Sequence, residues 1–429
     1  MHKVDTMKEK IEEITNDNRK PYTAAVNTGQ YVKKTGLTGK YDNVRRFWED
    51  EVTRLFIRPF LKEAVDRKAQ RLERLRILDV GCGSGDGYDL LMGITAKDVG
   101  IYEYAVDLIN PEQLGFYRGI DINPDLIEQA RELHSLNNKV VFECGDCFDS
   151  SFTNSKPFDI YFTSYGTISH FTADQTAALL SDIAEHSENN ALLIIDWLGR
   201  FSYEWQDLWS ADRKEQFMDY RISYIYPPEE RDSLDIQSFP LKLTCREGAM
   251  SIINEASSRS GVEIKVRKFF DRSIFVGRHI DTAEYNRNCT PLREAVNSLL
   301  EPNIRTDLNS LIVDYVSREG FPELNRFFDK FSSSWNSLIN HTIEFLADFG
   351  DEGKTGEVSP DFYQFYPEPL RKAVQTMEKV VKSTGNLPGD SRANIIEPQL
   401  AYALRKLEME LQTGDGVGHG LVGVFEIKK

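Results

Sequence analysis

The sequence predicts an α/β fold, in which a parallel sheet carries helices on both of its faces. Short apolar runs that have the length of buried strands alternate with helical segments between residues 76 and 198. A glycine-rich turn follows the first of these runs, and acidic residues end the second and the third. Strands that alternate with helices pair in parallel through right-handed crossovers, so we expect one continuous sheet.

The first expected strand, Arg76–Val80, leads into a turn with glycine at every second position from 81 to 87. Glycine lets the backbone turn sharply and approach a ligand, because it has no Cβ. The dinucleotide pattern Gly-x-Gly-x-x-Gly does not fit, since its last position falls on Asp86 or Tyr88. An acid there would repel a pyrophosphate, whereas Asp79 near the strand end can hold a cationic ligand.

Four further strands follow, and polar residues stand at their ends. The second expected strand, Phe116–Asn123, contains Asp121, whose carboxylate can accept from both hydroxyls of a ribose. The third is Val140–Asp146, the fourth is Phe158–Thr167 and the fifth is Ala191–Asp196. Ligands of open α/β sheets bind at the carboxyl ends of the strands, so we expect the site at this edge.

The pattern Asp-x-Gly-x-Gly-x-Gly, which begins at Asp79, resembles motif I of the class I methyltransferases. The cofactor of that family is S-adenosylmethionine, which has no phosphate and carries an ammonium and a sulfonium. The resemblance implies a transferase with a Rossmann-like sheet and an N-terminal helical lid. It also implies the cofactor-binding residues Asp79, Gly81, Cys82, Gly83, Gly85, Asp121, Ile122, Asp146, Cys147, Ser164 and Tyr165, of which Asp146 and Cys147 meet the adenine.

Methyl transfer is an in-line displacement at a sulfonium carbon, so proximity and orientation supply most of the catalysis. A general base helps when the acceptor is a hydroxyl, and His170 is the catalytic candidate. It follows the fourth strand in a stretch that resembles the Gly-Thr-Leu-His-His sequence of many small-molecule methyltransferases. The substrate-binding candidates are Tyr41, Arg46, Arg278 and His279, and no cluster with metal-ligand spacing predicts a metal site.

The chain is too long for a minimal core, and the sequence predicts four regions. Residues 1–75 form an N-terminal helical cap, and residues 76–289 form the core with additions on the substrate side. Within these additions Trp197–Tyr220 predicts a helix and Arg221–Tyr226 a strand. Residues 290–411 are a mostly helical insertion. Residues 412–429 return to the sheet, with Leu421–Ile427 antiparallel beside Val262–Phe269 as the resembled fold would have it. The alternative is a separate helical domain with a stray edge strand.

The charge, hydropathy and cysteine content of the chain limit the kinds of partner and location that we expect. A net charge of −16 disfavours nucleic acid, because such a surface repels phosphate backbones. No apolar run has the length of a membrane span, and five cysteines give no disulfide framework, so a cytoplasmic location is expected.

The leading hypothesis is therefore an S-adenosylmethionine-dependent methyltransferase that carries out O- or N-methylation of a small molecule. The alternatives are a methyltransferase for protein side chains or carboxyl groups, and a catalytically silent domain whose helical insertion binds a partner protein.

Overall fold

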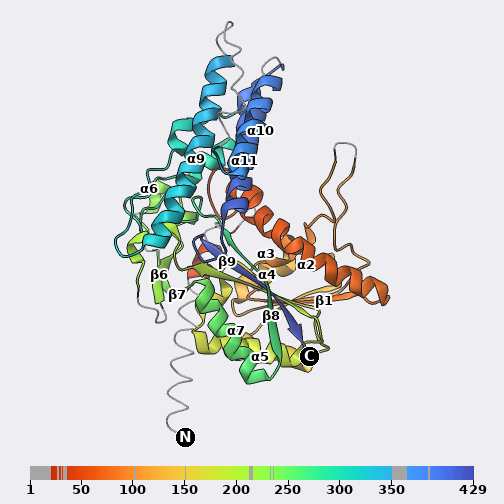
Figure 1. Ribbon diagram of the computed structural model, residues 1–429. Coiled ribbons are helices and arrows are strands. Elements are labelled where there is room, and N and C mark those ends of the chain that lie inside the picture. The colour runs from red at the N-terminus through yellow and green to blue at the C-terminus, as the bar shows by residue number, and fades with distance from the viewer. Residues whose placement is uncertain are drawn as a thin grey trace.

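A computed structural model describes residues 21–26, 29, 31, 36–100, 103–149, 151–211, 216–231, 233–234, 236–349, 365–384 and 387–429. In these ranges nine strands form one sheet (Figure 1). Five of them run parallel in the order β3-β2-β1-β4-β5. Their bounds are β1 (Leu75–Val80), β2 (Leu114–Asp121), β3 (Val140–Cys144), β4 (Ile160–Thr163) and β5 (Leu192–Gly199).

The last strand of the chain completes the sheet from within. Strand β9 (Gly420–Lys428) lies antiparallel between β5 and β8 (Glu263–Arg272), and Figure 1 shows it in blue inside the sheet. The predicted fold class is thus confirmed, including the helical insertion before the last strand. The alternative with a stray edge strand is wrong, because β9 is paired along both of its edges.

The segment after β5 differs from the sequence expectation. Residues 203–208 form the short helix η5 (Tyr203–Leu208), and β6 (Gln216–Arg221) covers the end of the expected helix. Where a strand was predicted, the chain forms the turn η6 (Ser223–Ile225) before α6 (Pro228–Arg231). Strand β6 pairs antiparallel with β7 (Ser238–Thr244). Strand β7 in turn pairs with β5 only at the last two residues of β5, Leu198 and Gly199. The hairpin therefore extends the sheet at its carboxyl edge.

Helices cover both faces of the sheet, and the side chains of each strand alternate between two apolar layers. Ile77 and Ile194 belong to one layer, whereas their neighbours Leu78 and Ile195 belong to the other. The first layer contains α2 (Asp50–Gln70), α3 (Asp86–Met92) and α4 (Pro124–Leu133). The second contains α5 (Ala173–His186) and α7 (Arg246–Ser260). In the described residues no helix is long and apolar enough to cross a membrane.

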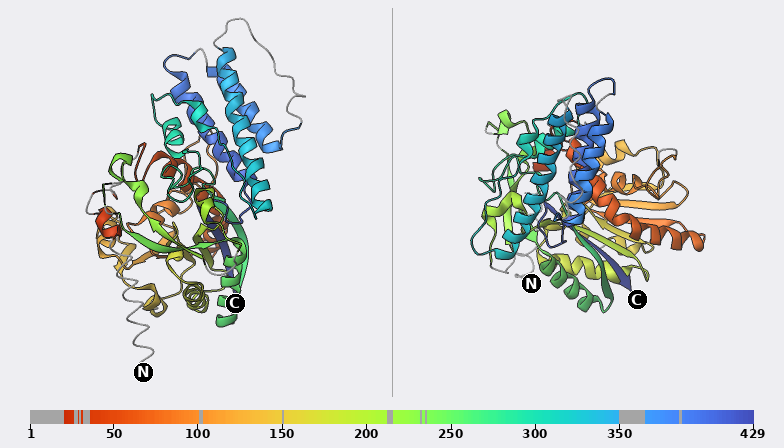
Figure 2. Two further views of the ribbon diagram at one scale, coloured as in Figure 1. Left: turned by 90° about the vertical axis from the view of Figure 1, so that its left-hand side faces the viewer. Right: turned by 45° about the horizontal axis from the view of Figure 1, so that its top comes forward.

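The insertion between β8 and β9, residues 290–411, is called the helical block. Figure 2 shows it rising from one side of the sheet, and its helices are α8 (Arg293–Leu299), η7 (Leu308–Leu311), α9 (Pro322–Phe349), α10 (Glu368–Thr384), η9 (Arg392–Ile396) and α11 (Glu397–Leu411). Buried polar contacts tie it to the rest of the chain. Glu408 accepts from the indole N–H of Trp48 at 2.9 Å and from the backbone N–H groups of Ser273 and Ile274.

The N-terminal part carries the predicted helix, although its first twenty residues lie outside the described ranges. The Asp42 carboxylate accepts from the backbone N–H of Arg45 at 2.8 Å, as an acid at a helix start does. A π-helical turn, η1 (Arg45–Glu49), then leads into α2. This start places Arg45 and Glu49 at the carboxyl edge of the sheet, where they line the cavity described next.

Candidate active site

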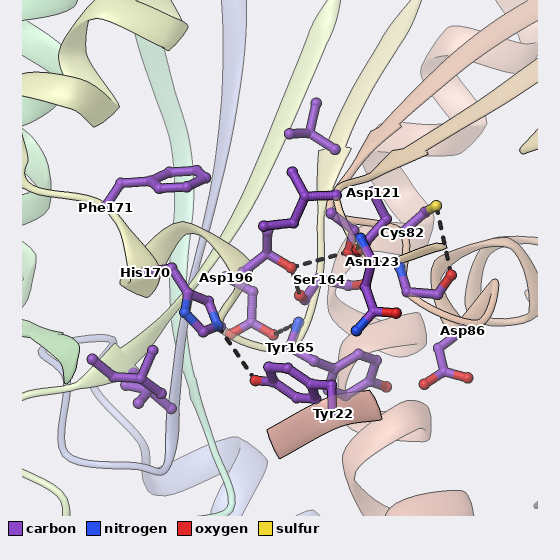
Figure 3. A pocket seen from close by; sticks show the side chains of 18 of the residues that line it. Tyr22, Cys82, Asp86, Asp121, Asn123, Ser164, Tyr165, His170, Phe171 and Asp196 are labelled. Carbon is purple, nitrogen blue, oxygen red and sulfur yellow. Dashed lines mark hydrogen bonds between the residues drawn. The ribbon is translucent and has the colours of Figure 1, made fainter. Parts of the chain in front are cut away.

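A cavity of about 770 Å³ lies at the carboxyl edge of the parallel strands, and Figure 3 shows side chains around it. We call its two sides the glycine side and the charged side. The glycine side is formed by the ends of β1 to β4 and includes Gly81, Cys82, Gly83, Asp121, Ile122, Asp146, Cys147, Ser164 and Tyr165. The charged side comes from the N-terminal segment and from residues of β5 onward, with His170 beside them, and includes Tyr22, Lys40, Arg45, Glu49, Asp196, Tyr220, Tyr224, Leu241, Arg272, Arg278 and His419.

The glycine turn takes a backbone conformation that strongly favours glycine. Gly81, Gly83 and Gly85 have φ angles of 69°, 50° and 87°, in the left-handed region. A Cβ on Gly81 would come within 2.0 Å of Thr167 Cγ2, so the turn also packs closely against the segment that follows β4. The turn thus keeps a concave backbone surface open on the glycine side of the cavity.

Asp121 ties the ends of β1 and β2 together. One carboxylate oxygen accepts from the backbone N–H of Gly83 at 2.9 Å, and the other accepts from Asn123 N at 2.8 Å. Both bonds hold the carboxylate at the cavity wall, where its remaining lone pairs can accept from a bound ligand. The position matches the ribose-binding role that the sequence suggests, and that role stays a prediction.

Asp79 does not line the cavity. Its side chain is completely buried and accepts from the hydroxyl of Tyr117 at 2.5 Å. Burial raises the pKa of Asp79 to about 8. The neighbouring Gly87 has a structural reason to be glycine, because a Cβ there would lie 2.2 Å from the Asp79 carboxylate. Asp79 therefore supports the turn from behind, and Gly85 of the predicted set is likewise not among the lining residues.

Two predicted residues close the glycine side at its far ends. Cys147 is buried beside Asp146, and burial raises the pKa of its thiol. Tyr165 turns with a positive φ of 52°, and its N–H donates to Asp196 at 2.8 Å. The Arg45 guanidinium lies over the Tyr165 ring, 3.2 Å from its centroid. Tyr165 thus stands where the glycine side meets the charged side.

His170 lies in the short helix η4 (Thr167–His170) after β4, and Figure 3 shows its ring facing Tyr22. Its Nε2 is 3.3 Å from the hydroxyl of Tyr22, and its ring stacks on Phe239. Burial lowers the pKa of His170 to about 4, so the ring is neutral at pH 7. The imidazole has a lone pair available, but it is a weak base.

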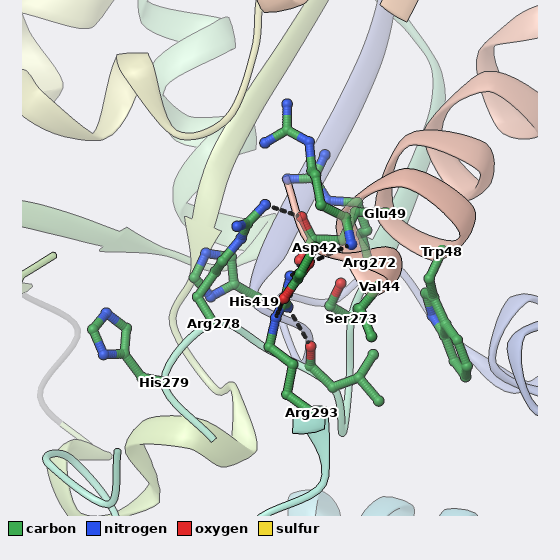
Figure 4. Close-up of polar contacts among 12 residues, drawn as sticks. Asp42, Val44, Trp48, Glu49, Arg272, Ser273, Arg278, His279, Arg293 and His419 are labelled. Carbon is green, nitrogen blue, oxygen red and sulfur yellow. Dashed lines mark hydrogen bonds and ion pairs between the residues drawn. The ribbon is translucent and has the colours of Figure 1, made fainter. Parts of the chain in front are cut away.

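A network of buried ion pairs forms the charged side (Figure 4). Arg272 donates to Asp196 at 2.8 Å, and Arg278 donates to Glu49 at 2.6 Å. Arg293 of the helical block donates to the other oxygen of Glu49 at 2.7 Å. Burial alone would raise the pKa of Glu49, but Arg278 and Arg293 hold it well below its ordinary range. The cations are thus fixed by acids from distant parts of the chain.

The four predicted substrate residues occupy different places. Arg278 lines the cavity, whereas His279 packs behind the wall, with its ring 4.7 Å from that of Tyr220. Tyr41 donates to Asp86 at 2.7 Å and is not a lining residue. Arg46 lines a separate shallow pocket near Arg405. Only Arg278 therefore has a position from which it can contact a ligand in this cavity.

Sequence reasoning missed Tyr22, Lys40 and His419, all of which line the cavity. A signal existed for the last, because glycines flank His419 directly before the terminal strand. A strand that runs antiparallel to its neighbours begins at the edge where they end, so its first residues reach the site. Within the described ranges no group of three His, Cys, Asp or Glu side chains could hold a metal ion.

Part of the chain matches a known protein family. Residues 108–190, from the loop before β2 to the loop after α5, match the family model described as a methyltransferase domain. A methyltransferase from Methanosarcina mazei is 16% identical, and the match covers 47% of this chain and 85% of that one with a TM-score of 0.33. An amino pentose methyltransferase from Micromonospora echinaspora is also 16% identical. That match covers 54% of this chain and 88% of that one, with a TM-score of 0.29. The comparison with curated proteins gave no match.

The matched segment lies within the parallel sheet and includes β2, β3 and β4. The protein is thus an enzyme in which residues 108–190 match a methyltransferase domain. S-adenosylmethionine is the cofactor that the sequence predicts for such a domain.

Proposed function

We propose that the enzyme methylates an oxygen or a nitrogen of a small-molecule acceptor. The observation that carries this proposal is the cover over the cavity. Thr23 of the N-terminal segment donates to Asp125 at 2.7 Å and accepts from the side-chain amide of Asn123, both at the start of α4. These bonds hold Tyr22 inside the cavity against His170. A site covered in this way has room for a small molecule rather than for the surface of a folded protein.

The size and chemistry of the cavity fit a cofactor together with an acceptor. Cavities of about 300–1,000 Å³ hold ligands of ordinary metabolite size. On the glycine side, Asp121 would hold the ribose and the backbone around Gly81 would face the methionine part. S-adenosylmethionine supplies, when bound, a methyl group on a positively charged sulfur. The charged side is left for the acceptor.

The charged side has a mixed character that points to an acceptor with a polar group on an apolar body. Tyr220, Tyr224 and Leu241 give it an apolar wall. The same side presents the guanidinium groups of Arg272 and Arg278, and that of Arg278 lies 5.3 Å from the centroid of the Tyr224 ring. Because both cations already have acidic partners, they suit neutral polar groups of the acceptor as well as an anionic one.

The cofactor site is tested by Asp121→Ala. Losing the charge-assisted hydrogen bonds of this carboxylate costs roughly 1.5–3 kcal/mol, so calorimetry with S-adenosylhomocysteine should show about 10- to 150-fold weaker binding. Glu143→Ala is the matched control, because Glu143 lies on β3 with its carboxylate against Arg118 and does not line the cavity. Equal affinity in the two variants would show that β2 does not hold the ribose.

The acceptor class is tested with methyl-labelled cofactor and a cell extract separated by size. Label should enter molecules that pass a small-pore filter. Label that enters only the retained protein would overturn the small-molecule proposal in favour of a protein acceptor. Binding of S-adenosylhomocysteine without any methyl transfer would favour the catalytically silent alternative.

A further inference from the structure

A second histidine, His419, faces the charged side of the cavity. It directly precedes β9 and is fixed by its backbone on both sides. Its carbonyl accepts from Gly199 N at 2.9 Å, and its N–H donates to the carbonyl of Ser273 at 3.0 Å. These bonds place it between the carboxyl end of β5 and the loop after β8, and Figure 4 shows its ring near Arg278. The position lies on the opposite side of Asp196 from the glycine turn.

A buried glutamate holds the ring of His419. Glu204 in η5 is completely buried, and its Oε1 accepts from His419 Nδ1 at 2.8 Å. Its Oε2 accepts from the backbone N–H of His279 at 2.5 Å. Burial alone would raise the pKa of Glu204, but His419 and the N–H donor lower it below its ordinary value. The carboxyl group is therefore ionised at neutral pH.

The surroundings leave Glu204 little room to move. A Cβ on Gly277 would lie 1.9 Å from Glu204 Oε1, so this glycine is required for the close approach. The hydroxyl of Ser202 donates to the same oxygen at 3.2 Å. The carboxylate is thus fixed from three directions, by Ser202, His279 and His419.

The geometry determines which nitrogen of His419 carries the proton. An ionised carboxylate only accepts hydrogen bonds, so the proton of the neutral ring stays on Nδ1 and Nε2 keeps its lone pair. Nε2 has no hydrogen-bond partner among the described residues, and the ring lines the cavity. The pair thus presents a proton acceptor to the space left for the methyl acceptor.

We propose that His419 is the general base of the reaction, that Glu204 is its positioning residue, and that the acceptor atom is a hydroxyl oxygen. This rests on the proposed function. His419 Nε2 takes the hydroxyl proton while the oxygen forms its bond to the methyl carbon and the carbon–sulfur bond electrons pass to sulfur. The positive charge of the sulfonium thus ends on the imidazolium, where Glu204 stabilises it, and the proton then leaves to solvent.

The comparison with His170 favours His419 as the base. The partner of His170 is the neutral phenol of Tyr22, which has no negative charge with which to stabilise an imidazolium. Burial moreover lowers the pKa of His170 to about 4. His419 has an ionised carboxylate as its partner, as catalytic histidines do in enzymes that abstract hydroxyl protons. His170 is then left to contact the acceptor and the N-terminal cover.

The first test needs no acceptor. Long-range proton–nitrogen NMR on protein labelled at histidine nitrogens reports the tautomer, and His419→Ala identifies the signal. At pH 8 the signal should show a protonated Nδ1 and a free Nε2. Glu204→Gln should raise the share of the other tautomer, whereas Glu397→Gln should not. Glu397 is an equally buried glutamate, paired with Arg392 in the helical block. A protonated Nε2 in the wild type would overturn the proposal.

The second test uses the hydroxyl compound that gives turnover in the labelling screen. His419→Ala should lower kcat by about 10²–10⁴-fold and leave the affinity for S-adenosylhomocysteine within about threefold. Added imidazole should restore part of the lost rate, since it can enter the space of the missing ring. Glu204→Gln should lower kcat, and Glu204→Asp should have a kcat between that variant and the wild type. If the Glu204→Gln protein does not fold, Glu204→Asp is the variant to measure.

These outcomes separate the two proposals. A chain that does not bind S-adenosylhomocysteine contradicts the proposed function itself. A chain that binds it and transfers methyl, but shows full turnover in His419→Ala or no rescue by imidazole, contradicts only the base assignment. A screen in which only amines accept the label also contradicts the hydroxyl acceptor.

Discussion

The two sides of the cavity are built in different ways. The glycine side comes from consecutive strand–turn–helix units, and its fixed contacts run through the backbone, as between Asp121 and Gly83 N. The charged side is held by side chains that are far apart in sequence. Arg278 and Glu49 are 229 residues apart, and His419 and Glu204 are 215 residues apart. A local pattern therefore specifies the first side, whereas the second exists only once the chain has folded.

Removal of β9 is the strongest test of whether the two sides of the cavity depend on each other for folding. Deleting residues 420–429 takes a central strand from between β5 and β8 and exposes apolar faces and two unpaired edges. We expect insoluble protein, measured as the fraction that remains in the supernatant after expression. A soluble truncation that still binds S-adenosylhomocysteine would show that the glycine side folds without the charged side.

Arg293→Ala tests how far the charged side depends on the helical block. Arg293 donates to both oxygens of Asp42 and to Glu49. Its removal leaves the buried Asp42 without its ion-pair partner and leaves Glu49 paired with Arg278 alone. The free energy of unfolding should fall by about 3–5 kcal/mol in urea titrations. Arg305→Ala is the control, because its ion pair with Asp390 is exposed and is worth about 0–1 kcal/mol. Equal losses in both would contradict the network.

Gly81→Ala tests the glycine side alone. The added Cβ would meet Thr167 and force a left-handed backbone, so binding of S-adenosylhomocysteine should weaken by about 100-fold or more. Gly261→Ala is the matched control, because Gly261 has a similar φ of 67° with nothing within 4 Å of its Cβ position. Both variants carry the backbone strain of about 1–2 kcal/mol, but only the first should lose affinity.

The smallest expected effect is a pH dependence that originates behind the glycine turn. The folded state raises the pKa of Asp79 from 3.8 to about 8. Between these values the unfolded chain is the form that has lost the proton, so stability falls as the pH rises. From pH 5 to 7 this residue contributes a slope of at most about 1.4 kcal/mol per pH unit. Asp79→Asn should flatten the slope in urea unfolding at several pH values, and an unchanged slope would contradict the assignment.

The sequence by itself determined the fold class and most of the glycine side. The apolar runs fixed the strands, since a buried parallel strand needs a short continuous apolar stretch. The turn at Gly81 and the acid at Asp121 act on residues near them in the sheet, so their positions could be predicted from spacing. The structure of the segment after β5 could not be predicted from its apolar pattern. The antiparallel pairing of β6 with β7, rather than helical periodicity, decides that structure.

Only the tertiary structure decided the charged side. His279 and Arg46 have the side chains of ligand-binding residues, but folding turns the first behind the wall and the second to another pocket. His419 lines the cavity because β9 is antiparallel and therefore begins where the other strands end. Its partner Glu204 could not be identified from spacing, since a buried ion pair depends on which segments fold against each other. Local patterns specify backbone turns, whereas long-range packing specifies which side chains meet.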